Sequence, residues 1–404
     1  MISAQYKLDE TSIFRPIITA ASKDLVSFAK YLRPNDDVHV ELKNLNQAEK
    51  AFILAVLCGY HRMYPNQQVE IKIGKKFCKL ISVPPLELIH KPRFFLNLQL
   101  TSRCNFSCKH CYNQLKNKHL KNPDLSLKAI EKICRQFLAV ERARDFVDIS
   151  VYLLGGEPFL HPDLPEIITM LSRIKVNGLN FNYIALGSNG LLVPKNIDLL
   201  KRARDLFESF SVQISIDGDA RIYQQIRGRK IDGALQALEA LKQANIKRYI
   251  NCTVSRLNSS CLEYILELCE KYGAGPHITP YVPFNDDLEA LTRSEWETFK
   301  LYLTGMSKKW HIGSCGYGRS CAIGWNGTSI DPEGYIIGCP RDPEVMGHID
   351  YISLMDNKLW RTKEEGPFLF YERCGRFMKN DIAGEIKSVN LTSGCKANAG
   401  SGRI

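Results

Sequence analysis

Three cysteines lie close together in one short segment, with the spacing Cys-x3-Cys-x2-Cys. Cys104, Cys108 and Cys111 follow directly after residues 94–100, whose apolar and β-favouring side chains predict a strand. A structural zinc site normally has four ligands, whereas a four-iron cluster held by three thiolates keeps one iron open for a small molecule. The spacing therefore indicates either an iron–sulfur cluster with an open iron or a zinc site that takes a distant fourth ligand.

The sequence around these cysteines, CNFSCKHCY at residues 104–112, resembles the defining motif of the radical S-adenosylmethionine (radical SAM) superfamily. Three further matches follow in the family's order, each at the end of a predicted strand: Gly155-Gly156-Glu157-Pro158, Ser188-Asn189-Gly190 and Ser215-Ile216-Asp217-Gly218. Together the matches cover about residues 94–283. The resemblance implies that Cys104, Cys108 and Cys111 hold a [4Fe-4S] cluster that binds S-adenosyl-L-methionine.

The resemblance also implies which residues contact the two ends of the methionine moiety. Gly155 and Gly156 have no side chains, so the backbone can approach a ligand closely, and Glu157 can accept a hydrogen bond from an ammonium group. In related enzymes this stretch binds the methionine amino group. Arg227, in Gln225-Ile226-Arg227-Gly228, stands where those enzymes place an arginine against the methionine carboxylate, which suits a guanidinium fork.

The resemblance also implies roles for five other residues in or near these motifs. Ser188, Asn189 and Ser215 are expected to contact the ribose or the methionine carboxylate. His110 precedes the third cysteine at a position that is usually aromatic in the family, and we expect it to lie near the adenine. Asp217 is expected to shape its turn rather than to touch the cofactor.

A second group of cysteines lies in the last hundred residues. Cys315, Cys321 and Cys339, with Gly334 between the last two, resemble the first half of the SPASM domain, which carries auxiliary iron–sulfur clusters in enzymes that modify peptides and proteins. Residues 331–335, Asp-Pro-Glu-Gly-Tyr, resemble the hairpin turn of that motif. Scattered core packing better explains the remaining thiols: Cys58, Cys78, Cys134, Cys252, Cys261 and Cys269.

The rest of the SPASM cysteine pattern is incomplete in this chain. Phe377 stands three residues after Cys374, and no cysteine follows Cys395. A second auxiliary cluster therefore lacks most of its ligands, and the tail is closer to the shorter "twitch" form. One auxiliary [4Fe-4S] cluster is predicted, with Cys395 as its fourth ligand and Cys374 as the competing candidate.

The resemblance implies a reaction in which a 5′-deoxyadenosyl radical abstracts hydrogen from the substrate. An auxiliary cluster can accept the electron that remains when a substrate radical closes a bond, so oxidative formation of a C–C or thioether crosslink in a ribosomally made precursor peptide is the favoured reaction. A small-molecule radical SAM dehydrogenase or cyclase is the alternative enzyme. An RNA-modifying protein or a non-catalytic iron–sulfur protein is the alternative from another class.

These residues must be positioned by a scaffold, and the middle of the chain predicts one. Strand-like segments at residues 94–100, 149–154, 182–186, 211–216, 249–254 and 278–282 alternate with helical stretches at residues 127–141, 164–174, 197–206, 231–243 and 260–272. This alternation predicts a parallel sheet, and its even spacing favours a partial (β/α)6 TIM-like barrel over an open doubly wound sheet.

Two further units flank the predicted barrel. Alternating apolar and polar residues predict strands at 38–42 and 69–73, with a helix from Asn44 to about Tyr60 between them and an earlier helix near residues 24–32. The expected α/β chain thus has a small N-terminal α/β domain at 1–91 for peptide or partner recognition, a radical SAM partial barrel at 92–305 and a cysteine-rich SPASM/twitch-like domain at 306–404.

Composition and charge limit the class of protein. The 404 residues are 45% hydrophobic and 24% charged, which is typical of a globular protein and excludes collagen-like and disordered classes. The net charge of +11 permits an anionic partner, but the Lys and Arg residues are spread along the chain, so nucleic acid is not the expected ligand. With no secretory signal or membrane-spanning run, we expect a cytoplasmic enzyme that takes a peptide substrate, with a leader segment, and an electron donor such as flavodoxin or ferredoxin.

Overall fold

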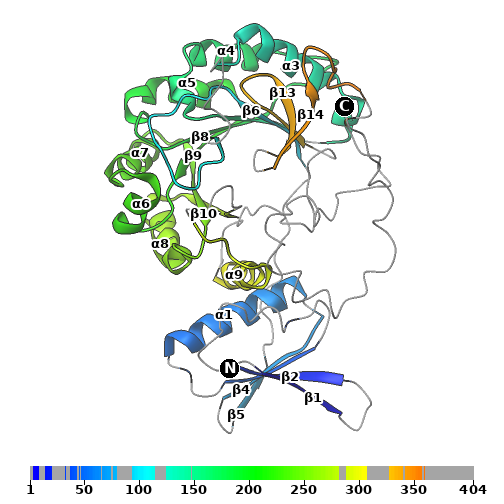
Figure 1. The fold of residues 1–404 in the computed structure, drawn as a ribbon, viewed down its shortest axis with the longest axis vertical. Helices are drawn as coiled ribbons and strands as arrows, with labels where there is room; N and C mark the ends of the chain where they lie inside the picture. Colours follow the sequence, from blue (N-terminus) through cyan, green and yellow to red (C-terminus); the bar gives the residue numbers. More distant parts are fainter. Residues whose placement is uncertain are drawn as a thin grey trace.

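The computed structural model contains two β-sheets with helices packed against them (Figure 1). None of the helices in the described segments is long and apolar enough to cross a bilayer. The structure describes residues 3–8, 14–20, 32, 37–42, 45, 47–64, 66–73, 76–79, 93–113, 124–146, 148–281, 288–306, 327–339, 342–356 and 359.

The N-terminal sheet has five strands in the order β1-β2-β3-β4-β5. The strands β2, β3 and β4 are parallel, and the outer strands pair antiparallel to their neighbours. The two strands predicted from alternation are confirmed as β3 and β4, and helix α1 lies between them as expected. The bounds are β1 Ser3–Leu8, β2 Phe14–Ala20, β3 Val38–Leu42, α1 Gln47–Met63, β4 Val69–Ile73 and β5 Lys76–Lys79. The helix predicted near residues 24–32 lies outside the described residues, apart from Leu32.

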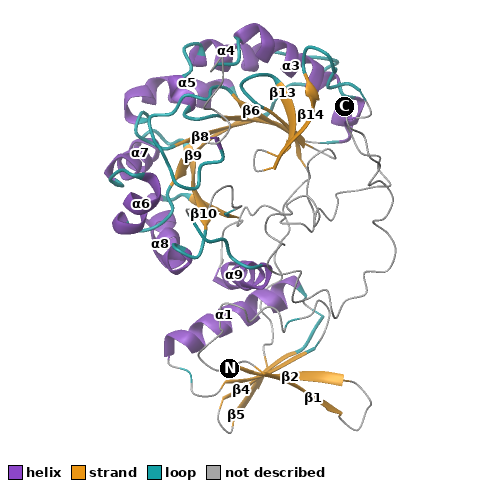
Figure 2. Ribbon diagram, viewed as in Figure 1, coloured by secondary structure: helices purple, strands orange, loops and turns teal. Residues whose placement is uncertain are grey.

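The second sheet contains six parallel strands in chain order, which confirms the predicted alternation of strand and helix. The strands are β6 Arg93–Gln99, β7 Asp148–Leu154, β8 Tyr183–Ser188, β9 Ser209–Ser215, β10 Lys247–Val254 and β11 Gly275–Pro280. The sheet curves, with the helices along its outer side (Figure 2). A mostly parallel α/β sheet is thus established, while a partial barrel remains a prediction.

Amphipathic helices cover the outer side of this sheet because one stripe of each is apolar. Helix α3 begins after Ser126, whose side chain accepts a hydrogen bond from the Ala129 N–H, and it buries Ile130, Ile133 and Phe137 at helical spacing. These helices are α3 Leu127–Ala139, α4 Leu164–Arg173, α5 Ile197–Leu206, α6 Ala220–Arg227, α7 Asp232–Gln243 and α8 Leu262–Tyr272, and a further helix, α9 Arg293–Met306, follows β11. Four of the cysteines predicted as core thiols are buried here: Cys134, Cys252, Cys261 and Cys269.

Helices α6 and α9 were not predicted from the sequence. Helix α6 is short, and it begins after Asp219, whose side chain accepts a hydrogen bond from the Ile222 N–H. Helix α9 packs against α1, and this contact links the N-terminal unit to the rest of the chain (Figure 1). Gly59 on α1 and Gly305 on α9 make it possible, because a Cβ at either glycine would collide with a backbone carbonyl of the other helix.

Three strands from the C-terminal region extend the second sheet beyond β6. Strand β12 (Gly327–Ile330) pairs parallel to β6, while β13 (Tyr335–Cys339) and β14 (Asp342–His348) continue antiparallel. The predicted turn at residues 331–335 joins β12 to β13, with Gly334 at a φ of +92° and the Asp331 carboxylate accepting from the Glu333 and Tyr335 N–H groups. The hairpin is therefore confirmed.

Candidate functional site

The cysteine loop and the strand-end motifs meet at one edge of the second sheet, because parallel strands all end at the same edge. The loop follows β6 and is tied to two neighbours. The Lys109 N–H donates to the Ile226 carbonyl of α6 at 2.9 Å, and Asn113 Nδ2 donates to the Gly155 carbonyl after β7 at 2.9 Å. The loop is thus fastened to the elements that carry the other predicted site residues.

The three thiols of the loop differ in their exposure. Cys104 is exposed, Cys111 is half-buried and Cys108 is buried. Burial raises the pKa of Cys108 to about 12, against a lowering influence of Arg227, and burial also raises the pKa of Cys104. No three His, Cys, Asp or Glu side chains in the described part of the chain converge closely enough to hold a metal ion. The loop supplies the sulfur donors that a cluster needs, on one short segment, but not in a closed cage.

Gly155 and Gly156 lie where the chain after β7 crosses the start of the cysteine loop. A Cβ on Gly155 would lie 2.6 Å from the Thr101 carbonyl oxygen, and one on Gly156 would collide with the Arg103 carbonyl. The Gly156 N–H donates to the Thr101 carbonyl at 2.7 Å. The close approach that requires glycine here is thus to the chain's own backbone, whereas the expected contact with a ligand remains a prediction.

Glu157 is completely buried and, within the described part of the chain, accepts hydrogen bonds from neutral groups only. Its Oε1 accepts from the Ser188 hydroxyl at 3.0 Å and from the Phe159 N–H at 3.4 Å, and its Oε2 accepts from the Asn189 N–H at 2.9 Å. Burial raises the pKa of Glu157 to about 7, although these donors favour the charged form. The carboxyl group is therefore poised to ionise fully when a positive group arrives.

The end of β8 connects Glu157 to the cysteine loop. Besides its backbone bond to Glu157, Asn189 donates from Nδ2 to Asn105 Oδ1 at 2.7 Å, and Asn105 follows the first cysteine. Ser188 and Asn189 are both buried. The structure therefore brings these two predicted site residues next to Glu157, where they support its carboxylate.

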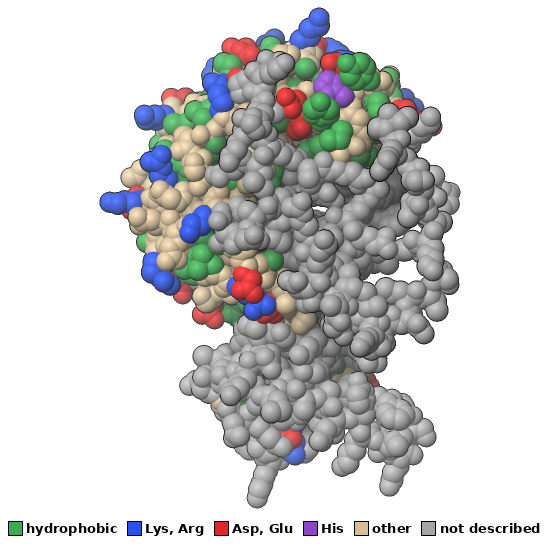
Figure 3. Space-filling view, viewed as in Figure 1, with side chains coloured by type: hydrophobic (Ala, Val, Ile, Leu, Met, Phe, Trp, Pro, Cys, Tyr) green, Lys and Arg blue, Asp and Glu red, His purple; other side chains and the backbone are tan. Residues whose placement is uncertain are grey.

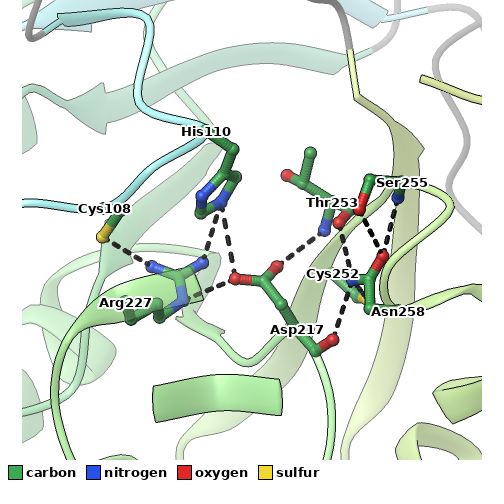
Figure 4. Close-up of polar contacts among 8 residues, drawn as sticks. All are labelled: Cys108, His110, Asp217, Arg227, Cys252, Thr253, Ser255 and Asn258. Carbon is green, nitrogen blue, oxygen red and sulfur yellow. Dashed lines mark hydrogen bonds and ion pairs between the residues drawn. The ribbon is translucent and has the colours of Figure 1, made fainter. Parts of the chain in front are cut away.

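Arg227 and Asp217 are buried and, together with the largely buried His110, form a polar group beside Cys108 (Figure 4). Arg227 Nε lies 2.6 Å from Asp217 Oδ2, Nη1 donates to Cys108 Sγ at 3.8 Å, and Nη2 lies 3.5 Å from His110 Nε2. His110 Nε2 is also 3.4 Å from Asp217 Oδ2. Arg227, expected against a methionine carboxylate, is thus paired with a carboxylate of the chain itself.

The charges of this group determine one another. Burial alone would raise the pKa of Asp217, but Arg227 and His110 bring it below its ordinary value. Burial works to lower the pKa of Arg227, yet Asp217 raises it above its usual range. Burial lowers the pKa of His110 to about 4, so the ring is neutral near pH 7. The group therefore contains one ion pair and one neutral imidazole.

Asp217 is fixed from the side of β10. Its Oδ1 accepts from the Thr253 N–H at 2.9 Å, and its backbone carbonyl accepts from Asn258 Nδ2 at 2.8 Å. Asn258 is buried and also accepts from the Ser255 N–H at 2.7 Å. Sequence reasoning gave Asp217 only a role in its turn and did not consider Asn258. The sequence did contain a signal for the pair. Asp217 follows an apolar strand and stands ten residues before Arg227, and two opposite charges that become buried need each other as partners.

The other predicted site residues are placed as follows. Ser215 ends β9 and is half-buried, and Cys339 ends β13. Cys315, Cys321, Cys374 and Cys395 lie outside the described residues, and the auxiliary cluster stays a prediction. On the face seen in Figure 3, the described Lys and Arg side chains are scattered among acidic and neutral ones, and this face carries no basic stripe among those residues.

Three buried polar atoms in the loop or on the adjoining elements β6 and α6 have neither a hydrogen-bond nor an ion-pair partner among the described residues. They are Gln99 Nε2 on the last residue of β6, His110 Nδ1 in the loop and the Tyr223 hydroxyl on α6. Buried polar groups are normally hydrogen-bonded, so such atoms fit a polar ligand. With three thiols in the loop and a buried Glu157 that accepts hydrogen bonds from neutral donors among the described residues, the residues present fit a cluster and S-adenosylmethionine.

Comparison with known proteins shows which family the middle of the chain resembles. Residues 98–269 match the family model of the Radical SAM superfamily. The chain is 26% identical over 279 residues to the sporulation killing factor maturation protein SkfB of Bacillus subtilis, which covers 64% of this chain and 63% of that protein. It is 27% identical over 215 residues to GTP 3′,8-cyclase of Xanthomonas campestris, covering 51% of this chain and 59% of that protein. It is 28% identical over 180 residues to PqqA peptide cyclase of Streptomyces rochei, covering 44% and 45%. The chain thus spans less than two thirds of the length of these relatives.

Solved structures share the fold. The chain superposes on anSMEcpe with bound AdoMet with a TM-score of 0.52 at 16% identity, covering 69% of this chain and 80% of the other. It superposes on Streptococcus suis SuiB bound to the precursor peptide SuiA with a TM-score of 0.51 at 15% identity, covering 66% and 64%. At these identities the likeness concerns the fold alone.

Proposed function

We propose, from the premise that residues 98–269 form a radical SAM domain, that this chain is an enzyme that oxidises a peptide with S-adenosylmethionine as co-substrate. The observation that carries the proposal is the three-thiol loop fastened beside a buried carboxyl group whose hydrogen-bond donors, among the residues that the structure describes, are all neutral. Cys104, Cys108 and Cys111 would hold the cluster, and Glu157 would accept the ammonium group of the cofactor.

The chain's own residues bind and orient in this mechanism. When bound, the cluster and S-adenosylmethionine supply an electron and a 5′-deoxyadenosyl radical that removes a hydrogen atom from the substrate. Ser188 and Asn189 hold the Glu157 carboxylate in place, and Gln99, His110 and Tyr223 present polar atoms for the ligand. Packing against the loop excludes water from Glu157, which strengthens its attraction for a positive group.

A peptide is the proposed substrate, and a crosslink is the proposed product. The alignment with SkfB extends over 279 residues, beyond the length of the radical SAM domain itself. Forming one C–C or thioether bond removes two hydrogen atoms from the peptide. One leaves with the deoxyadenosyl group, and the other leaves as a proton and an electron. The proposed auxiliary cluster on Cys315, Cys321, Cys339 and Cys395 would accept that electron.

The partners of the reaction are proposed on the same basis. A flavodoxin or ferredoxin would reduce the cluster, and residues 1–91 would recognise the leader segment of the precursor. The recognition role is preferred because α1 packs on α9 and not on the six parallel strands of the second sheet, whose ends carry the predicted cofactor-binding residues. Its alternative is that this unit only stabilises the remainder of the chain.

A small-molecule cyclase is the second candidate, since GTP 3′,8-cyclases are among the relatives. Their alignment covers 51% of this chain, against 64% for SkfB. The peptide reaction is therefore preferred, and GTP becomes a substrate to be tested beside it.

The test uses the full-length chain, reconstituted anaerobically with iron and sulfide and reduced with dithionite. Peptides encoded by short reading frames next to the gene are offered separately from GTP. We expect 5′-deoxyadenosine together with a peptide lighter by two hydrogen atoms. Conversion of GTP with unchanged peptides would support the second candidate, and no cleavage of S-adenosylmethionine under any condition would reject both.

A further inference from the structure

The guanidinium of Arg227 has three different neighbours in three directions. Its Nε lies 2.6 Å from Asp217 Oδ2, its Nη1 is 3.8 Å from Cys108 Sγ and its Nη2 is 3.5 Å from His110 Nε2 (Figure 4). The group is planar and its donors form a rigid fork. Fixing the Nε side on a carboxylate therefore fixes where the two terminal nitrogens point.

Asp217 is the better anchored member of this pair. It is completely buried, and its second carboxylate oxygen accepts from the Thr253 N–H at 2.9 Å. Its carbonyl accepts from Asn258, which also donates to the Thr253 carbonyl at 2.9 Å. Strand β10 thus holds the Asp217 side chain and Asn258, four residues beyond the strand, holds its backbone, whereas Arg227 reaches Asp217 from the last turn of α6 through a long flexible side chain.

We propose that Asp217 is a positioning residue that holds Arg227 against Cys108, and that this N–H···S contact makes a cluster carried by Cys108 easier to reduce. The inference rests on the proposed function, because it requires a cluster on that thiolate. Reduction adds negative charge to a cluster, and hydrogen bonds to its sulfurs stabilise the added charge. The positive end of the Arg227–Asp217 pair faces the sulfur.

The two roles that Asp217 could have predict opposite signs. If Asp217 acted only through its own negative charge, its removal would make the cluster easier to reduce. If it acts by positioning, its removal frees Arg227 from Cys108 and makes the cluster harder to reduce. The direction of the shift in Asp217→Asn therefore separates positioning from plain charge.

The experiment is a redox titration of the reconstituted full-length protein, followed by EPR. The cluster on Cys108 is identified as the one whose signal changes when S-adenosylmethionine is added. In Arg227→Gln we expect the ratio of reduced to oxidised cluster at a fixed potential to fall about tenfold, which corresponds to about 59 mV for a one-electron couple. Asp217→Asn should shift the ratio in the same direction, and the double variant no further than Arg227→Gln alone.

Arg229→Gln is the matched control. Arg229 is an exposed arginine two residues further on, and its Nη2 donates to the Asn105 carbonyl of the same loop at 3.3 Å. Its replacement removes the same charge from the neighbourhood without touching Cys108. We expect a shift well below that of Arg227→Gln, and an equal shift would show that net charge alone is responsible and overturn the proposal.

Further variants keep the proposal testable if Asp217→Asn does not fold. Arg227→Lys keeps the charge but not the fork, so it should shift the ratio part of the way. The double variant Asp217→Asn/Arg227→Gln contains no unpaired charge. An upward shift in Asp217→Asn, or unchanged ratios in Arg227→Gln and Arg227→Lys, overturns the proposal. If the wild type cleaves S-adenosylmethionine while the variants leave the ratio of reduced to oxidised cluster unchanged, only this inference fails. If the wild type never cleaves S-adenosylmethionine, the proposed function fails. In that case the ratios still show whether the contact between Arg227 and Cys108 affects the cluster.

Discussion

Two carboxyl groups stand at the same edge of the sheet, both completely buried, in opposite electrostatic surroundings. Glu157 accepts hydrogen bonds from a hydroxyl and two backbone N–H groups, and burial raises its pKa to about 7. Asp217 lies 2.6 Å from Arg227, which brings its pKa below the ordinary value against the effect of burial. One carboxyl group is held by dipoles and the other by a cation.

The difference shows which of the two can serve an incoming ligand. The charge of Asp217 is already neutralised, so a cationic ligand would have to compete with Arg227. Glu157 has hydrogen bonds that fix its position, but no cationic side chain among the described residues pairs with it directly, and the charge of Arg227 only partly offsets its burial, so an ammonium group would gain an ion pair there. We therefore propose Glu157 as the carboxyl group that binds the ligand and an internal role for the Asp217 carboxylate, while the contact of Arg227 with a methionine carboxylate stays a prediction.

The largest expected effect comes from removing the thiols of the cysteine loop, which lies beside both carboxyl groups. Replacing Cys104, Cys108 and Cys111 by alanine is expected to abolish cleavage of S-adenosylmethionine and to reduce the iron content from about eight to about four per chain. Iron analysis and chromatography of 5′-deoxyadenosine measure both. Cys269→Ala, which removes a buried core thiol of α8, is the control and should keep all the iron. An iron content near twelve, or zinc in its place, would contradict the assumed ligands.

The ion pair predicts the next largest effect, on stability. Asp217→Asn leaves Arg227 as an unpaired buried charge, and breaking a buried pair in this way costs about 3 to 5 kcal/mol. Denaturant unfolding of the cluster-free protein measures the change. The double variant Asp217→Asn/Arg227→Gln should recover most of the loss, because it leaves no unpaired charge. Equal losses in the single and double variants would show that the pair does not matter energetically.

The contrast between Glu157 and Asp217 appears in the pH dependence of stability, to which Glu157 contributes near neutral pH. Its folded pKa of about 7 lies above the unfolded value, so its contribution to stability is complete below the unfolded pKa and is lost as the pH rises through about 7. Between pH 5 and pH 8 the cluster-free wild type should lose about 2 to 3 kcal/mol more than Glu157→Gln does. Unfolding midpoints of both proteins at several pH values test this. Parallel curves for the two proteins would mean that Glu157 does not titrate in this range.

Cofactor affinity sharpens the same comparison. If Glu157 takes the ammonium group, Glu157→Gln should weaken S-adenosylmethionine binding by about 1.5 to 3 kcal/mol while the clusters remain. Affinity for S-adenosylhomocysteine, which keeps the same ammonium group, should fall by a similar factor. Equilibrium dialysis of the oxidised protein measures both without turnover. Unchanged affinity would remove Glu157 from the binding site.

The order of elements was predictable from the sequence because it depends on local periodicity. The helix predicted at residues 197–206 is α5, and each of the six strands was located within a few residues. Helix α6 was missed because only Asp219 and Gly228 mark its ends and its apolar stripe covers two turns. The pairing of Asp217 with Arg227 was missed for a different reason. Which of several possible partners a buried arginine takes depends on how β9, α6 and β10 pack, and this cannot be read from spacing along the chain.

The smallest predicted effect concerns a single neutral donor. Ser188 Oγ donates to Glu157 Oε1 at 3.0 Å and accepts from the Gly190 N–H at 3.0 Å. In Ser188→Ala the carboxylate keeps the donors from Phe159 and Asn189 while the Gly190 N–H loses its acceptor, so the expected loss of stability at pH 8 is about 1 to 2 kcal/mol, as for two ordinary hydrogen bonds. At pH 5 the loss should be smaller, because the protonated carboxyl group no longer needs every donor. A loss as large as that of Asp217→Asn would mean that Glu157 depends on Ser188 as Asp217 depends on its cation, and the distinction between the two carboxyl groups would fail.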